Sequence, residues 1–152
     1  MEDKKNFSLN DFVSFDLSQT FYKYKVKTTK FFKTLNLDLT PEYILILSLI
    51  KENPKIIQSD LVKLLEKDKS NISKIIDILV NKGYIKRKIT KTDNKQVRHL
   101  SIEKKGIEIL EVAEPLIIEI QNMAFDGISQ MEIQILKTVL EKIRKNLEKQ
   151  EV

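Results

Sequence analysis

The chain has 152 residues, no cysteine and one histidine, and its formal net charge is +5. The lack of cysteine excludes disulfides, thiolate metal sites and thiol redox sensing, and the single His99 argues against a zinc site built from several histidines. No apolar run reaches the roughly 20 residues of a membrane span. These features predict a soluble cytoplasmic protein of one domain, with or without a helical extension, and without a cofactor.

The positive charge is concentrated in the middle of the chain. Residues 40–106 contain 15 lysines and arginines against 8 acidic residues, whereas the rest contains 12 basic and 14 acidic residues. A concentration of this kind is expected of a surface that neutralises nucleic-acid phosphates. Charge alone leaves a lysine-rich solvated surface as the alternative.

Two helices are predicted in the first third of the chain. Residues 8–36 repeat large apolar side chains at three- and four-residue spacing, which is typical of an amphipathic helix. A second, mostly buried helix begins at Thr40-Pro41-Glu42, where a capping side chain, a proline and an acidic residue follow one another. Asn53-Pro54 ends it. We expect its buried residues to be Ile44, Leu45, Leu47, Leu49 and Ile50.

The central segment predicts a winged helix-turn-helix. A short helix over residues 58–66, with Leu61, Leu64 and Leu65 inside, is followed by a second helix over residues 68–82 that ends at Gly83. Ile72, Ile75, Ile76 and Leu79 form the inner stripe of that second helix. Two basic strands follow over residues 84–89 and 97–102, in which Ile85, Ile89, Leu100 and Ile102 alternate as half-buried strand residues do. Asp93-Asn94 suits the turn between them.

The C-terminal part is predicted to be helical from about Glu103. Pro115 is expected to kink or restart this helix, and Ser129 and Glu132 form a capping box that opens a last amphipathic helix. The two chain ends carry more apolar surface than one small lobe needs, which favours packing against a second copy. The fold class is therefore mainly α with a small β-wing, divided into an N-terminal dimerisation helix (1–39), a winged helix-turn-helix DNA-binding lobe (40–102) and C-terminal dimerisation helices (103–152).

In the order and spacing of these motifs the chain resembles the MarR family of bacterial transcription regulators. The matches include Gln58-Ser-Asp-Leu61, Asp68-x-Ser70-x-Ile72-Ser73, Leu79-x-x-x-Gly83-Tyr-Ile-x-Arg87, Asp93-x-Lys95-x-x-Arg98 and Lys105-Gly106. Lys95 departs from the family, which usually has arginine there, and Ile57, Val62 and Glu103 replace a capping Ser or Thr, an alanine and a threonine. The resemblance implies a homodimer on double-stranded DNA with a palindromic operator, a repressor role, and release by an aromatic or other anionic small molecule.

Candidate DNA contacts follow from side-chain chemistry. Hydroxyl, amide and ammonium groups at the start of the second helix of the motif can bond to base edges or phosphates, and we assign this role to Lys69, Ser70, Asn71, Ser73 and Lys74. Wing and flanking contacts are assigned to Lys86, Lys88, Lys91, Lys95 and Arg98. Arg98 paired with Asp93, shaping the hairpin, is the favoured alternative for Arg98, and His99 is expected to be an outward strand residue.

The remaining assignments concern an effector and competing functions. Tyr22, Tyr24, Phe32 and Tyr43 are candidate effector-pocket residues, with core or interface packing as the alternative. There is no catalytic constellation and no phosphate-cradling glycine-rich loop, so we do not expect an enzyme, and we expect no metal site. Two other classes stay open: a constitutive DNA-organising protein and a winged-helix module for protein contacts.

Overall fold

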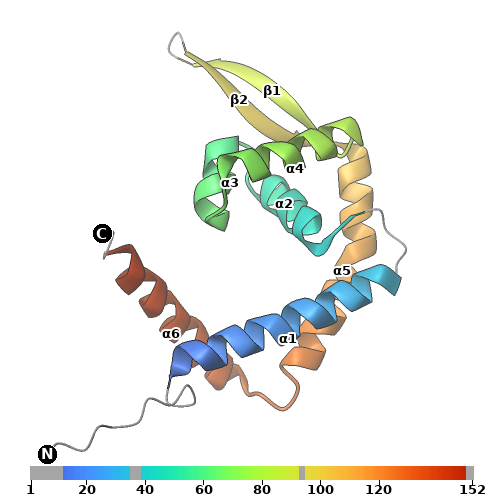
Figure 1. Cartoon of the computed structure of the whole chain (residues 1–152). Coiled ribbons are helices and arrows are strands. Elements are labelled where there is room, and N and C mark those ends of the chain that lie inside the picture. The colour runs from blue at the N-terminus through green and yellow to red at the C-terminus, as the bar shows by residue number, and fades with distance from the viewer. Residues whose placement is uncertain (1–11, 35–38, 93–94, 150–152) are drawn as a thin grey trace, which may run out of the picture. The chain divides into compact units, whose positions relative to one another are not determined.

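The computed structural model describes residues 12–34, 39–92 and 95–149, without the side chains of residues 91, 92, 95 and 96. The contacts divide the chain into two compact units. The first unit ends at Ile120 and the second begins at Gln121, and each is described separately. Within the described residues the elements follow in the order α1 (Val13–Thr34), α2 (Pro41–Glu52), α3 (Gln58–Leu65), α4 (Lys69–Asn81), β1 (Ile85–Thr92), β2 (Lys95–Ile102), α5 (Lys104–Ala124) and α6 (Gln130–Glu148) (Figure 1). This is the predicted mainly α fold with a small antiparallel wing.

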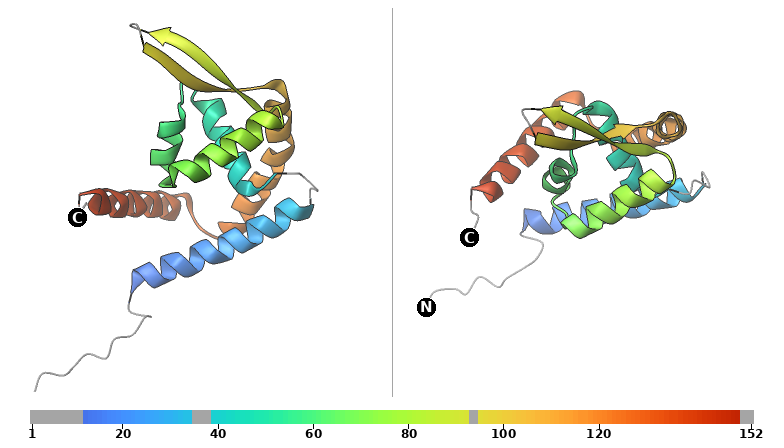
Figure 2. Two further views of the ribbon diagram at one scale, coloured as in Figure 1. Left: turned by 45° about the horizontal axis from the view of Figure 1, so that its top comes forward. Right: turned by 90° about the horizontal axis from the view of Figure 1, so that it is seen from above.

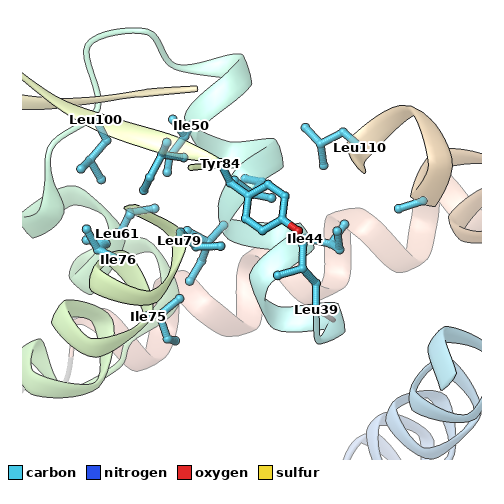
Figure 3. Close-up of a cluster of buried hydrophobic side chains, with 14 of the residues drawn as sticks. Leu39, Ile44, Ile50, Leu61, Ile75, Ile76, Leu79, Tyr84, Leu100 and Leu110 are labelled. Atoms are coloured by element: carbon cyan, nitrogen blue, oxygen red, sulfur yellow. The ribbon is translucent and has the colours of Figure 1, made fainter. Parts of the chain in front are cut away.

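The core of the first unit lies where α2, α3, α4 and the base of the wing meet. Figure 3 shows leucine and isoleucine side chains from these elements gathered around the ring of Tyr84. Helix α5 adds Leu110, Ala113, Leu116 and Ile120 to the same cluster, and Phe32 adds a side chain from α1. The fully buried members include Ile44, Ile46, Leu47, Ile50, Leu61, Ile72, Ile76, Leu79 and Ile85.

The start of α2 confirms the predicted cap. Thr40 has extended backbone angles, and its Oγ1 accepts a hydrogen bond from the Tyr43 N–H at 3.4 Å. Pro41 occupies the first turn, where a missing N–H costs nothing. At the other end Asn53 is the C-cap, with its Nδ2 donating to the Leu49 carbonyl oxygen at 2.9 Å.

The apolar stripe of α4 fixes how this helix is rotated about its own axis. All four predicted residues, Ile72, Ile75, Ile76 and Leu79, are buried. They recur at three- and four-residue spacing and therefore share one face. Gly83 ends the helix with a φ of +75°, a left-handed conformation that glycine adopts without steric cost.

The wing is a regular hairpin held to the lobe at its base. β1 pairs antiparallel with β2, with Ile85 opposite Ile102 and Ile89 opposite Arg98. A further bridge joins β2 to the residues before α3, because the Leu100 N–H donates to the Ile56 carbonyl oxygen at 2.9 Å. The predicted hairpin turn at residues 93–94 lies outside the described residues.

The junction between the wing and α5 is tightly packed around Tyr84. The Glu103 N–H donates to the Tyr84 carbonyl oxygen at 2.9 Å. The Lys105 ammonium lies 4.8 Å from the centre of the Tyr84 ring and donates to the Lys82 carbonyl oxygen at 2.9 Å. A Cβ atom on Gly106 would lie 2.3 Å from the Tyr84 carbonyl oxygen, so this approach of α5 requires glycine.

The second unit contains the end of α5 and the whole of α6. Ser129 and Glu132 form the predicted capping box: the Ser129 N–H donates to Glu132 Oε2 at 2.8 Å, and the Glu132 N–H donates to Ser129 Oγ at 3.3 Å. The hydrogen bond from the Ser129 hydroxyl lowers the pKa of the Glu132 carboxyl. None of the α6 residues is buried within the chain.

Three expectations about burial were wrong. Leu45, Leu64 and Ile89 were predicted to be inside, but their side chains are 49%, 61% and 56% exposed. An apolar side chain is buried only where another element covers it, and no described element covers these three. The helix from Glu103 was expected to kink or restart at Pro115, and it does not restart there, because α5 continues through this residue. Pro115 lies on an exposed face, where the carbonyl that loses its partner can bind water.

We expect Gly106→Ala to destabilise the first unit. Glycine to alanine in a helix gains about 1 kcal/mol of helix propensity. The added methyl meets a backbone oxygen that cannot rotate away, and overpacking of this kind costs about 1–3 kcal/mol. The net loss should appear as a lower urea midpoint. Glu111→Ala, at an exposed site of the same helix, is the control, and equal midpoints for both variants would contradict the packing described for Tyr84.

Candidate nucleic-acid interface

The first two turns of α4 carry polar side chains that are available to bind another molecule. Lys69, Ser70, Asn71 and Lys74 are exposed and Ser73 is half-buried. None of the five side chains has a hydrogen bond or ion pair with another described residue. The buried stripe faces inward, so these residues face solvent together. A helix with this arrangement can place hydroxyl, amide and ammonium donors against base edges.

The start of α4 also leaves backbone donors free. Asp68 is the N-cap residue, and its side chain makes no capping hydrogen bond. The first helical N–H with a backbone partner there is that of Ile72, which donates to the Asp68 carbonyl oxygen at 3.1 Å. The preceding amides are at the positive end of the helix dipole, which favours a phosphate near this end.

The two faces of the wing differ in what they contact. On one face Arg87 of β1 forms an ion pair with Asp77 of α4. On the other face Lys86 forms an ion pair with Glu103. Lys86 is therefore already engaged within the protein, whereas Lys88 and Arg98 are exposed and have no ion pair with a described residue.

For two of the wing residues assigned to DNA contact, the structure describes only the backbone. Lys91 and Lys95 fall in the strands, but their side chains are not described. The Asp93 partner suggested for Arg98 also lies outside the described residues. His99 is half-buried, and its Nδ1–H donates to the Lys55 carbonyl oxygen at 2.7 Å.

Only part of the predicted effector site is brought together. A cavity of about 600 Å³ lies among α1, α2 and α4 in the first unit, and Phe32 and Tyr43 both line it. Tyr22 and Tyr24 do not line it; they lie on α1 with 61% and 38% exposure. The lining consists of Thr29, Phe32, Lys33, Leu39, Thr40, Pro41, Tyr43, Ile78 and Lys82.

Some features of the site could not be found by motif reading. The Asp77–Arg87 ion pair joins α4 to the wing, and the two residues are ten positions apart in different elements. Lys33 and Lys82 line the cavity together with Phe32 and Tyr43. No cluster of three or more metal-binding side chains occurs within residues 12–34, 39–92 and 95–149. Over the same part of the chain, no helix is long and apolar enough to cross a membrane.

Comparison with known proteins agrees with this geometry. The MarR family model matches residues 39–97. The chain is 29% identical over 114 residues to the HTH-type transcriptional regulator YybA of Bacillus subtilis, covering 75% of each protein.

Solved structures share the fold over most of the chain. A MarR family transcriptional regulator from Listeria monocytogenes, solved with a 26mer DNA, has a TM-score of 0.77 at 26% identity and covers 90% of this chain and 89% of its own. A MarR/EmrR family regulator from Acinetobacter sp. ADP1 has a TM-score of 0.82 at 18% identity, with 94% and 99% coverage. The chain is thus similar to MarR family regulators over residues 39–97, and it shares the fold of solved regulators of this family over most of its length.

Proposed function

We propose that the chain is a homodimeric repressor that binds a palindromic DNA operator with α4 in the major groove. This proposal rests on the exposed polar side chains at the start of α4, which make no hydrogen bond or ion pair with another described residue. The buried apolar stripe on the other side of the helix holds them toward solvent. The net positive charge of residues 40–106 supports it, since phosphate contacts supply much of the affinity for DNA. The similar regulator from Listeria monocytogenes was solved with a 26mer DNA, which supports DNA binding by this chain.

The dimer is supported by unpaired apolar surface on two helices. α1 exposes Val13 by 67% and Phe21 by 61%, and α6 exposes Met131 by 74% and Leu147 by 70%. Large apolar side chains that cluster on an exposed face are typical of surfaces that contact another protein. We therefore assign residues 1–39 and 103–152 to dimerisation and residues 40–102 to DNA binding. Two-fold symmetry would then place half-sites about 10 base pairs apart, centre to centre.

The effector is proposed to be an aromatic anion held in the cavity beside α4. Phe32 and Tyr43 offer aromatic surface, and Lys33 offers a positive charge at the same cavity. Ile78 of α4 and Lys82, which follows this helix directly, form another wall, so an occupant would touch the helix that is proposed to bind DNA. A ligand releases DNA only if it binds more tightly to the DNA-incompetent conformation.

We predict sequence-selective duplex binding with strong salt dependence. Selection from a random duplex pool should yield a palindrome, and its affinity should exceed that of a scrambled duplex by about 10³-fold or more. Fluorescence anisotropy at several salt concentrations measures both properties. Equal affinity for selected and scrambled duplexes would support a constitutive DNA-organising protein instead.

We predict that Asn71→Ala and Lys74→Ala lose discrimination at particular base pairs. A well-placed contact to a base edge is worth roughly 1–3 kcal/mol against the wrong base. The measurement compares each variant on single-substitution duplexes of the selected site. Asn81→Ala is the matched control, because Asn81 is an exposed asparagine in the last turn of the same helix. Uniform weakening on every duplex would make Asn71 a positioning residue.

We predict that Lys33→Ala and Tyr43→Phe reduce release by aromatic carboxylates without reducing operator affinity. By linkage, the factor by which a ligand weakens DNA binding equals the factor by which DNA weakens ligand binding. Calorimetric titration of the protein with salicylate, with and without operator DNA, measures the factor by which DNA weakens ligand binding. Tyr22→Phe, on a tyrosine that does not line the cavity, is the control. Release that is unaffected by either cavity variant would place the effector site elsewhere.

A further inference from the structure

Helix α1 carries a row of lysines on the side opposite its buried residue. Lys23, Lys27 and Lys30 recur at four- and three-residue spacing, so they lie along one face of a helix that runs without a break (Figure 2). Phe32, the buried residue of this helix, lies on the other side, because an α-helix has about 3.6 residues per turn. All three lysines are exposed, and together they are called the lysine stripe.

The charge of the lysine stripe is not neutralised by nearby acidic residues. Asp16, about two turns before Lys23, is the one acidic residue of α1. None of the three lysines has an ion pair with another described residue, although the Lys27 ammonium lies 5.4 Å from the centre of the Phe31 ring. Val26, one turn from Lys23 on the same side, is 53% exposed. This face therefore offers positive charge and apolar surface together.

Helix α5 carries a row of glutamates with the complementary charge. Glu108, Glu111 and Glu114 follow one another at three-residue spacing, and all three are exposed, so they are called the glutamate stripe. Ala113, on the other side of the helix, is fully buried in the core. Ile118, one turn beyond Glu114, is 51% exposed. This second face therefore offers negative charge and apolar surface together.

The two stripes match in length and are both available to another molecule. Each extends about 10 Å along its helix, at a rise of about 1.5 Å per residue. Glu108 has one long ion pair, with Lys104 at 3.7 Å, while Glu111 and Glu114 have none with a described residue. Between described residues, no ion pair joins the lysine stripe to the glutamate stripe of the same chain. A second copy of the chain supplies the partner for each stripe.

The lysine stripe also lies away from the apolar surface that is proposed to form the dimer. Phe21, an exposed residue of that surface, is about three helical turns from the buried Phe32 and so lies on the same side of α1. The lysine stripe is on the other side. Its pairing with the glutamate stripe joins two different surfaces, and contacts of this kind can continue from one dimer to the next.

We propose that the lysine stripe of one dimer binds the glutamate stripe of a neighbouring dimer, so that dimers at adjacent sites on one DNA bind cooperatively. This inference rests on the dimer and the DNA binding proposed above. Exposed ion pairs are individually weak, so the contact forms when one duplex holds two dimers at high local concentration. Because salt screens exposed charges, the cooperativity decreases as the salt concentration rises.

The test compares duplexes that carry one or two copies of the operator selected by the wild-type protein. The spacing between the two copies is increased one base pair at a time over two helical turns, so that neighbouring dimers meet in every rotational setting. In footprinting titrations the wild type should fill the paired sites about 10-fold more tightly than the single site, a factor expected from a few exposed ion pairs. The favourable spacings should recur about every 10 base pairs.

Charge reversal shows whether the two stripes make the contact. Lys27→Glu combined with Lys30→Glu should reduce the cooperativity factor to near one, and Glu111→Lys combined with Glu114→Lys should do the same. All four substitutions in one chain should restore the factor, because every pair is rebuilt with its signs exchanged. The factor is a ratio to the affinity for a single operator, so a general change in DNA affinity cancels.

A matched control keeps the change in net charge but leaves both stripes intact. Lys51→Glu combined with Lys55→Glu alters two exposed lysines outside α1 and α5, and the cooperativity factor should stay at the wild-type value. Loss of cooperativity in this control to the same extent would assign the effect to net charge and overturn the inference.

The remaining outcomes separate this inference from the proposed function. If the lysine stripe binds DNA phosphates instead, the four-substitution chain stays as uncooperative as the lysine variant, and the inference is wrong. Absence of cooperativity at every spacing also overturns it. If sedimentation at micromolar concentration shows that the reversed variants are monomers, the stripes belong to the dimer interface and the inference again fails. If the wild type is itself a monomer or selects no operator, the proposed function has failed.

Discussion

The burial of the α4 stripe is the constraint on which the rest of the interface depends. Ile72 and Ile76 are fully buried with Leu79, so the helix cannot rotate without exposing several large apolar side chains to water, each worth about 1.5–3 kcal/mol. That constraint turns Asn71 and Lys74 outward and holds them there. The specificity proposed for this protein therefore rests on an apolar core as much as on polar contacts, because the core determines which polar groups DNA can meet.

The wing and α5 are both fastened to this helix, at different points. Asp77 on the exposed side of α4 pairs with Arg87 of β1, and the last turn of α4 is contacted by Lys105 through the Lys82 carbonyl oxygen. Gly106 allows α5 to approach Tyr84 closely enough for that contact. Helix α4, the wing and the start of α5 consequently form one packed body. A ligand in the cavity that Ile78 and Lys82 line would act on this body as a whole.

Local patterns in the sequence were sufficient for the helices, two of their caps and the inward face of α4. The Thr40 cap, the Ser129–Glu132 box and the α4 stripe each depend on residues within one or two turns, and all were predicted correctly. What could not be predicted depends on distant parts of the chain. Leu64 and Ile89 are apolar yet exposed, because exposure depends on whether another element covers the site. The different surroundings of Lys86 and Arg98 follow from strand register, which the spacing of residues alone does not give.

The proposed placement of α4 in the major groove is tested most directly by methylation interference on the DNA duplex that the protein selects. Methylation of guanine N7 modifies the major groove, where α4 is proposed to lie. The account predicts that N7 methylation blocks binding in two clusters about 10 base pairs apart, centre to centre. Binding that tolerates N7 methylation throughout the selected site would contradict the major-groove placement of α4, and with it the central claim.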